Sequence, residues 1–136
     1  MATNIIYDRI FKGLKLVLGR RTIVRRDDAP KSSDYILLSM ESSPTLIENM
    51  GASFAMRYSV NIDFITNRAK KSQYITQQIS NLLRLLNDNP AKTTSGIYYW
   101  HDMAIEDTDF GELLDEDDRQ IYAGRILWTA THTEIK

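Results

Sequence analysis

The sequence predicts an α+β domain: a mostly antiparallel sheet of about four strands covered by two helices, in the chain order α-β-β-α-β-β. Two observations lead to this prediction. Apolar side chains recur on alternate residues in three segments, which is the period of a strand, and at spacings of three and four in two others, which is the period of a helix. The 136 residues are expected to form a single domain, residues 1–136, that buries a core without disulfides or a metal.

The first predicted helix ends near Gly19, a residue that commonly stops helices, and Thr3 or Asn4 can cap its start. Its apolar stripe consists of Ile6, Ile10, Leu14, Val17 and Leu18. The polar stretch 20–33 predicts a loop that can include a short strand at 22–24. A compact apolar run at 35–40 predicts a buried strand, and residues 45–51 predict a turn of helix or a loop.

The longest predicted strand, residues 52–66, has an apolar and a polar face. Its apolar face consists of Phe54, Met56, Tyr58, Val60, Ile62 and Phe64. The residues between them include Arg57, Ser59, Asn61 and Asp63, which predict a face turned largely to solvent. A second helix follows, which Ser72 can cap and which ends before Pro90. Its stripe consists of Ile75, Ile79, Leu82 and Leu86.

Two further strands are predicted in the last third of the chain. Between 97 and 105, Tyr98, Trp100 and Ala104 share one face, and His101 lies on the other. Residues 121–133 carry apolar side chains on both faces. This pattern indicates a central strand, or one whose second face is covered by a helix or a partner chain.

Composition excludes several functional classes. Hydrophobic residues make up 43% and charged residues 26% of the chain, as in ordinary globular proteins, and the formal net charge is −1. The charge gives no reason to expect free nucleic acid or an anionic membrane as a partner. The absence of cysteine excludes disulfides and thiol chemistry. No apolar run approaches the ~18 residues of a membrane span, so no membrane partner is expected.

The segment 106–118 is strongly acidic and predicts a solvated connection between the last two strands. All its charged residues are acids: Glu106, Asp107, Asp109, Glu112, Asp115, Glu116, Asp117 and Asp118. Three interpretations remain open: a solvated projecting loop, a loop that contacts a partner or lines a channel, and a site for a cation such as calcium. The spacing does not match an EF-hand loop.

A basic segment lies between the first predicted helix and the first long apolar run. It contains Arg20, Arg21, Arg25 and Arg26, followed directly by two aspartates. Guanidinium groups suit carboxylate or phosphate partners. The segment can be a solvated loop with surface ion pairs, a contact between subunits or, with less support, a contact to nucleic acid.

No catalytic constellation is recognisable. His101 and His132 are the two histidines, and adjacent strand residues such as His101 and Asp102 are expected to point to opposite faces. Nucleophile elbows, zinc-protease motifs and glycine-rich phosphate loops are all missing. We therefore predict no enzyme activity, no metal and no cofactor, and expect the aromatic run 98–100 to serve the core and an interface.

The order of elements resembles one known group of proteins. A first helix, a polar connection and a short strand at 35–38 precede the long strand at 57–64, the helix 72–87 and a strand pair with an acidic hairpin. This layout resembles the tail terminator, or tail completion, proteins of long-tailed bacteriophages, which include the lambda-type tail terminator.

The resemblance implies a virion structural protein of the tail or neck, made in the host cytoplasm and assembled into a homohexameric ring. Such a ring caps the tail tube, ends its polymerisation and joins the tail to the head connector. Its expected partners are other copies of the chain, the tail tube protein, the connector or stopper and, in a contractile tail, the end of the sheath, while DNA passes through without specific binding. The alternatives are another neck component or a tube protein, a small metal-binding protein, and a small nucleic-acid-binding domain.

Overall fold

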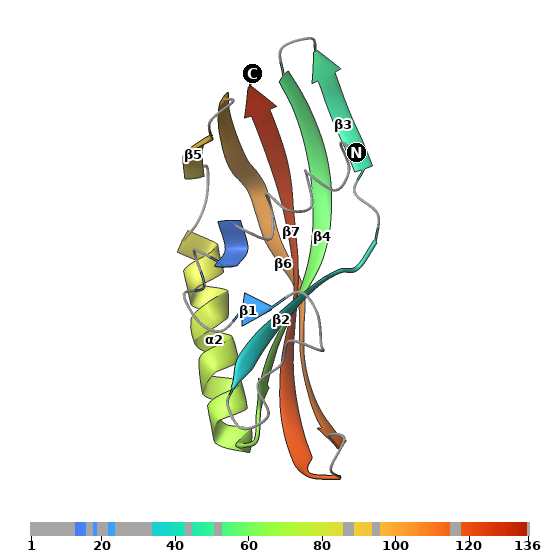
Figure 1. The fold of residues 1–136 in the computed structure, drawn as a ribbon, viewed down its shortest axis with the longest axis vertical. Helices are drawn as coiled ribbons and strands as arrows, with labels where there is room; N and C mark the ends of the chain where they lie inside the picture. Colours follow the sequence, from blue (N-terminus) through green and yellow to red (C-terminus); the bar gives the residue numbers. More distant parts are fainter. Residues whose placement is uncertain are drawn as a thin grey trace.

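One long sheet with a helix packed along it dominates the fold (Figure 1). The computed structural model describes residues 13–15, 18, 22–23, 34–42, 45–50, 53–85, 89–93, 96–114 and 118–135. The elements are β1 (Thr22–Ile23), β2 (Tyr35–Met40), β3 (Thr45–Met50), β4 (Ser53–Thr66), α2 (Ala69–Leu85), β5 (Asn89–Thr93), β6 (Gly96–Leu114) and β7 (Gln120–Ile135). Residues 13–15 and Leu18 are also helical. The α+β class is therefore confirmed.

The described strands form a seven-stranded sheet in the order β1-β2-β4-β7-β6-β5, with β3 also paired to β4. Only β1 and β2 pair in parallel, and the other pairs are antiparallel. β2 and β3 share one edge of β4, because β3 pairs with its first half and β2 with its second. The prediction of about four strands, with its element order, was therefore wrong.

The additional strands lie where local signals for a strand are weak. Residues 45–50 form β3, not the predicted turn or loop, and Asn89–Thr93 forms β5. Pro90 had indicated a break, but β5 is the last strand of the sheet order, and an edge strand tolerates proline because one row of its backbone groups needs no partner. The short strand predicted near residue 22 is confirmed as β1.

The core lies between α2 and one face of the sheet. The even-numbered residues of β4 are directly opposite those of β7, so both rows point toward the helix. The buried cluster consists of Leu14, Leu18, Ile36, Leu38, Tyr58, Val60, Ile62, Phe64, Ile75, Ile79, Leu83, Trp100, Ile126, Trp128 and Ala130. Within it, the rings of Trp100 and Trp128 meet edge to face with centroids 5.6 Å apart. The apolar face predicted for β4 is confirmed at Tyr58 through Phe64.

The first predicted helix contributes Leu14 and Leu18 to this core, as its stripe predicted. Its turn at Gly13 packs on the indole of Trp100, where a Cβ would lie 2.3 Å from the ring. The other predicted stripe residues, the caps and Gly19 lie outside the described residues.

Helix α2 begins at Ala69, three residues before the predicted cap. The carbonyl of Arg68 accepts the first helical hydrogen bond from the Ser72 amide at 3.0 Å, and Thr66 Oγ1 accepts one from the Arg68 amide at 3.4 Å. Ser72 is instead buried on the face toward the sheet. The predicted stripe holds at Ile75 and Ile79, but Leu82 is exposed and Leu83 takes its place in the core. Of the described helices, none is long and apolar enough to cross a membrane.

β6 contains two irregularities that the simple alternation did not predict. The pairing with β7 shifts between His101 and Ala104 and again between Ile105 and Asp107, and Asp102 has φ 50°. An extra residue at each bulge exchanges the two faces of the strand. Trp100 and Ile105 therefore both face α2, although their numbers differ by an odd step.

Candidate functional site

The most distinctive surface is the polar face, which we define as the side of the sheet opposite α2. Register places its residues in three rows: Asn61, Leu127 and Asp107; Asp63, Arg125 and Asp109; Arg57, Thr131 and His101. Residues directly opposite each other in antiparallel strands point to the same side. The polar face is therefore built jointly by β4, β7 and β6.

An ion pair lies at the centre of the polar face. Arg125 donates two hydrogen bonds to Asp63, from Nε at 2.7 Å and from Nη2 at 2.9 Å. The Asp63 side chain is only 7% exposed, whereas that of Arg125 is 53% exposed. The hydrogen bond to Asp63 raises the pKa of Arg125 above its usual value. Because a buried carboxylate is stable only with such a partner, the hydrogen bonds from Arg125 allow Asp63 to be buried on this face, where Asn61, Thr129 and Thr131 are buried as well.

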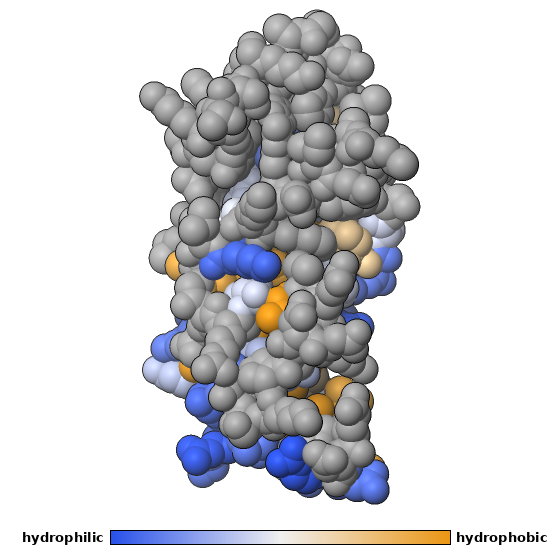
Figure 2. Space-filling view, viewed as in Figure 1, coloured by the Kyte–Doolittle hydropathy of each residue, from blue (hydrophilic) through white to orange (hydrophobic). Residues whose placement is uncertain are grey.

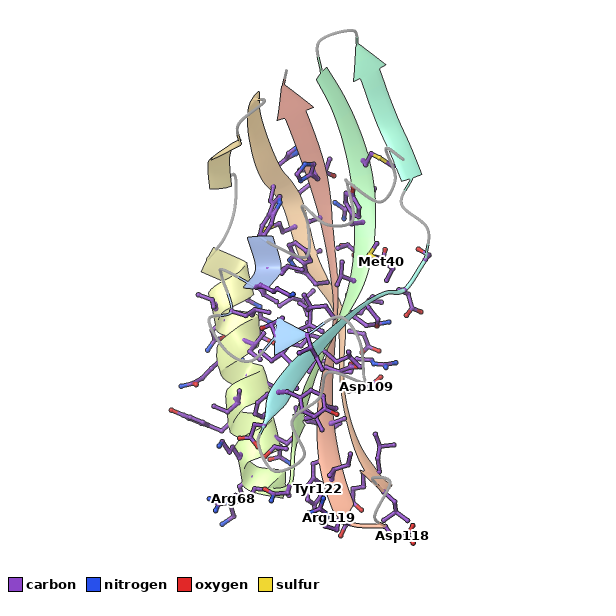
Figure 3. The ribbon with its side chains drawn as sticks, in the orientation of Figure 1. Met40, Arg68, Asp109, Asp118, Arg119 and Tyr122 are labelled. Atoms are coloured by element: carbon purple, nitrogen blue, oxygen red, sulfur yellow. The ribbon has the colours of Figure 1, made fainter. Side chains whose placement is uncertain are left out.

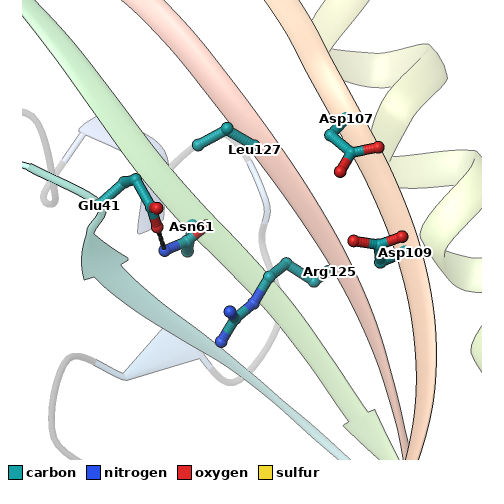
Figure 4. Close-up of a pocket in the computed structure, with 6 residues that line it drawn as sticks. All are labelled: Glu41, Asn61, Asp107, Asp109, Arg125 and Leu127. Atoms are coloured by element: carbon teal, nitrogen blue, oxygen red, sulfur yellow. Dashed lines mark hydrogen bonds between the residues drawn. The ribbon is translucent and has the colours of Figure 1, made fainter.

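A shallow hollow of about 160 Å³ lies beside this ion pair (Figure 4). It is lined by Glu41, Asn61, Asp107, Asp109, Arg125 and Leu127. The Asn61 amide donates a hydrogen bond to Glu41. Three carboxylates thus share the hollow with one guanidinium, which is already engaged by Asp63. The hollow therefore carries an excess of negative charge and suits a cationic side chain.

A second polar cluster surrounds Arg57. Its guanidinium donates hydrogen bonds to Thr131 Oγ1 at 3.1 Å, to Thr129 Oγ1 at 2.9 Å and to the carbonyl oxygen of Asp102. Thr129 in turn donates to Glu106 at 3.1 Å. Arg57 of β4 thus links the first bulge of β6, where Asp102 has φ 50°, to Thr129 and Thr131 of β7.

The bulge also brings together two residues that were expected to point apart. His101 Nδ1 lies 3.0 Å from Asp102 Oδ2, and His101 Nε2 lies 2.7 Å from Thr133 Oγ1. The prediction of opposite faces was wrong, because the alternation of a regular strand does not apply at a bulge. The order hydroxyl, imidazole, carboxylate is that of a nucleophile and its base. However, the Asp102 side chain is 78% exposed, so water screens its charge and the pair activates the hydroxyl weakly.

The predicted acidic loop is largely a strand. Asp107, Asp109 and Glu112 belong to β6, which continues to Leu114, and Asp118 follows in the turn with φ 57°. Asp107 and Asp109 lie on the polar face, whereas Glu112 is paired with Tyr122 and accepts a hydrogen bond from Gln120 at 2.8 Å. Pairing with β7 holds the backbone extended, and Glu112 lies on the opposite side from Asp107 and Asp109, so like charges did not prevent a strand.

Other predicted residues lie outside the described part of the chain. These are Asp115, Glu116 and Asp117 of the acidic segment, and Arg20, Arg21, Arg25 and Arg26 of the basic segment. In the described part, no group of three or more histidine and acidic residues could hold a metal ion.

The residues that organise the polar face were only partly recognised from sequence. Strand alternation predicts that Asp63 and Asn61 are solvated, and this prediction was wrong, because they are 5% and 6% exposed. A signal for this burial was present in the last strand, where Arg125, Thr129 and Thr131 all lie on the same face. This second polar face could have indicated that the polar residues of the two strands pair with each other. Comparisons with known protein families and with curated protein sequences find no match for this chain.

Proposed function

We propose that this chain is a structural subunit of the tail of a long-tailed bacteriophage. It forms a ring, of six copies by the resemblance, that caps the tail tube, ends its polymerisation and joins the tail to the head connector. The observation that supports this most directly is the two-sided architecture: one face of a long sheet is closed by α2, and the other carries ordered but accessible charged groups. An exposed, structured face of this kind is suited to binding a neighbouring subunit.

The end of the β6–β7 hairpin offers a second surface for assembly. Phe110, Leu113 and Leu114 are 52%, 47% and 67% exposed there. Figure 2 shows hydrophilic residues around this end of the molecule, and Figure 3 places Asp118, Arg119, Tyr122 and Arg68 there. Apolar side chains with a charged rim are typical of surfaces that bind protein. The tail tube protein and the connector or stopper are the partners this proposal assigns to the ring.

The acidic stretch between β6 and β7, residues 115–118, is compatible with a channel that passes DNA. Carboxylates repel phosphates, so a ring that presents them toward its lumen lets the duplex through without binding it. A contractile tail would add the end of the sheath as a further partner. A metal-binding role has less support, because the acidic groups do not converge as a metal site in the described residues. A nucleic-acid-binding role has less support because an acidic surface repels phosphates.

The proposal is tested by electron microscopy of the purified protein, followed by its addition to tail tubes while they polymerise. Rings with a central opening, and tubes whose growth stops when the protein is added, are expected. A strict monomer in light scattering at high concentration would contradict the proposal. If rings form but bind isolated connectors and leave tube growth unchanged, the alternative of another neck component is correct.

A further inference from the structure

We propose that the outer surface of α2 in one copy docks on the polar face of the next copy, so that each subunit contacts its neighbours head to tail. The inference deepens the proposed function and rests on the ring formation that it includes. It follows from opposite charges on the two sides of the same sheet.

In the described part of the chain, the polar face carries a clear excess of negative charge. The described residues place two guanidiniums on it, those of Arg57 and Arg125, and both are hydrogen-bonded within the subunit. The carboxylates on or beside this face are those of Glu41, Asp63, Asp102, Glu106, Asp107 and Asp109. Asp107, Asp109 and Glu41 are exposed around the hollow. This side of the subunit therefore attracts cations.

The outer surface of α2 has the opposite character. The helix contains Lys70, Lys71 and Arg84, and no aspartate or glutamate. Lys70, Tyr74, Gln77, Asn81 and Arg84 are all exposed and follow one another at spacings of four, three, four and three. They form one stripe along the helix, which we call the helix stripe. It has a cation at each end and neutral side chains between them.

The two surfaces also agree in length. Lys70 and Arg84 are 14 residues apart, which corresponds to about 21 Å along a helix. On the polar face, Asp109 is opposite Arg125, and His101, next to Asp102, is opposite Thr131. Six residues of β7 therefore separate the two ends of the acidic surface, or about 20 Å. Both cations of the helix stripe can thus reach carboxylates at the same time.

The direction and the apolar content of the surfaces support the same arrangement. α2 runs along the strands, so a neighbouring copy placed behind the sheet in a similar orientation presents its helix lengthwise to the polar face (Figure 1). Tyr74 in the helix stripe is 64% exposed, and Leu127 lines the hollow on the other side. These side chains can bury apolar area between the charged ends.

Such a contact is heterologous, since it joins two different surfaces of the same chain. Repetition of a heterologous contact gives a closed ring when the rotation between neighbours closes. The occupant of the polar face is therefore a second copy of this chain. A symmetric dimer would instead place like charges against each other and is disfavoured.

The test is a charge exchange between the two surfaces. The helix variant carries Lys70→Glu and Arg84→Glu, and the face variant carries Asp107→Lys and Asp109→Lys. All four positions are exposed, so both variants are expected to keep the circular dichroism spectrum of the parent protein. Glu112→Lys is the matched control, because Glu112 is an exposed β6 carboxylate whose register places it on the opposite side from Asp107 and Asp109.

Assembly is measured by sedimentation velocity at low salt. In each variant alone, the helix stripe and the polar face carry charges of the same sign and repel each other. The protein concentration at half-maximal assembly should therefore rise about a hundredfold. An equimolar mixture restores opposite charges at every contact and should form alternating rings, while Glu112→Lys should assemble normally. Rings that persist in both variants, or a mixture that stays dissociated, would overturn the docking but leave the proposed ring function standing. A parent protein that never assembles would overturn both.

Discussion

At Gly124 the backbone of β7 lies directly against Thr76 of α2, and Gly124→Ala should destabilise the protein. A Cβ at this position would lie 1.9 Å from Thr76 Oγ1 and 2.9 Å from Thr76 Cβ. Favourable contacts begin at about 3.5 Å, so the helix would have to move or Thr76 would have to leave its rotamer. Thr76 is completely buried, and a β-branched side chain has few alternatives in a helix.

The expected cost is about 2 to 3 kcal/mol, toward the upper end of the range for overpacked cores. At about 4 °C per kcal/mol for a domain of this size, Tm should fall by about 10 °C. Urea unfolding at 25 °C measures the free energy directly. Gly111→Ala is the control, because Gly111 lies in the adjacent β6 and a Cβ there meets nothing within 4 Å. Its free energy of unfolding should change by less than about 0.5 kcal/mol.

A double-mutant cycle separates this clash from any general effect of alanine in β7. Thr76 Oγ1 is buried with no hydrogen-bond partner in the described structure, so Thr76→Ala alone should cost less than about 1 kcal/mol. In the double variant the 1.9 Å contact disappears and the 2.9 Å contact to Cβ remains. A partial rescue with a coupling energy of about 1 to 2 kcal/mol is expected. Strict additivity, or an unaffected Gly124→Ala protein, would refute this account of the helix–sheet contact.

Three further predictions concern single side chains. Val60→Asp should lower the free energy of unfolding in urea by more than about 3 kcal/mol, because it buries an unpaired carboxylate in the core. Ser59→Asp, on the other face of β4, should lower it by less than about 1 kcal/mol. Equal losses would mean that the two faces are wrongly assigned. Burial opposes ionisation of Asp34, but the hydrogen bonds and positive charges of Lys71 and its neighbours outweigh it and lower the pKa of Asp34. Lys71→Met should therefore lose a few tenths of a kcal/mol at pH 6, and the difference should vanish as the pH falls through the lowered pKa, below about 3.8; a constant difference would exclude the pairing. Asp118 has φ 57°, a conformation that asparagine tolerates and valine does not. Asp118→Asn should therefore leave Tm unchanged, and Asp118→Val should lower the stability by about 1 to 2 kcal/mol. Equal Tm values for the two variants would argue against the left-handed conformation.

The periodicity of apolar side chains correctly predicted those helices and strands that bury one face in the core. The even residues of β4, the strand β2 and the middle of α2 were predicted correctly, because burial against a helix or a sheet leaves a clear pattern in the sequence. The prediction of the buried face of α2 was incomplete, since Ser72, Thr76 and Ser80 are as buried as the isoleucines of the helix. Small polar residues at these positions let the helix approach the sheet closely, and hydropathy alone does not identify them.

The polar face could not be derived from sequence because its burial depends on which strands become neighbours. The buried carboxylate of Asp63 accepts its hydrogen bonds from Arg125, which is 62 residues away in the chain. Pairing with β7 along the whole length of β4 places the two side chains opposite each other. Without that register, polar alternation on a strand has only one interpretation, exposure to solvent. The same register builds the hollow and the acidic surface of the proposed docking site.

The bulges of β6 decide which side of the sheet receives the acids. In a regular strand Ile105 and Asp107 share a face, so either the isoleucine would leave the core or the carboxylate would enter it. The second register shift separates them: Ile105 is opposite Trp128 in the core, and Asp107 is opposite Leu127 on the polar face. The first shift has the opposite effect: it brings Trp100 and Ile105, which would otherwise point to opposite sides, to the same side of the sheet. The extra residue at each bulge thus decides which apolar side chains of β6 face the core and which acids line the hollow. The acidic surface therefore depends on backbone geometry as much as on composition.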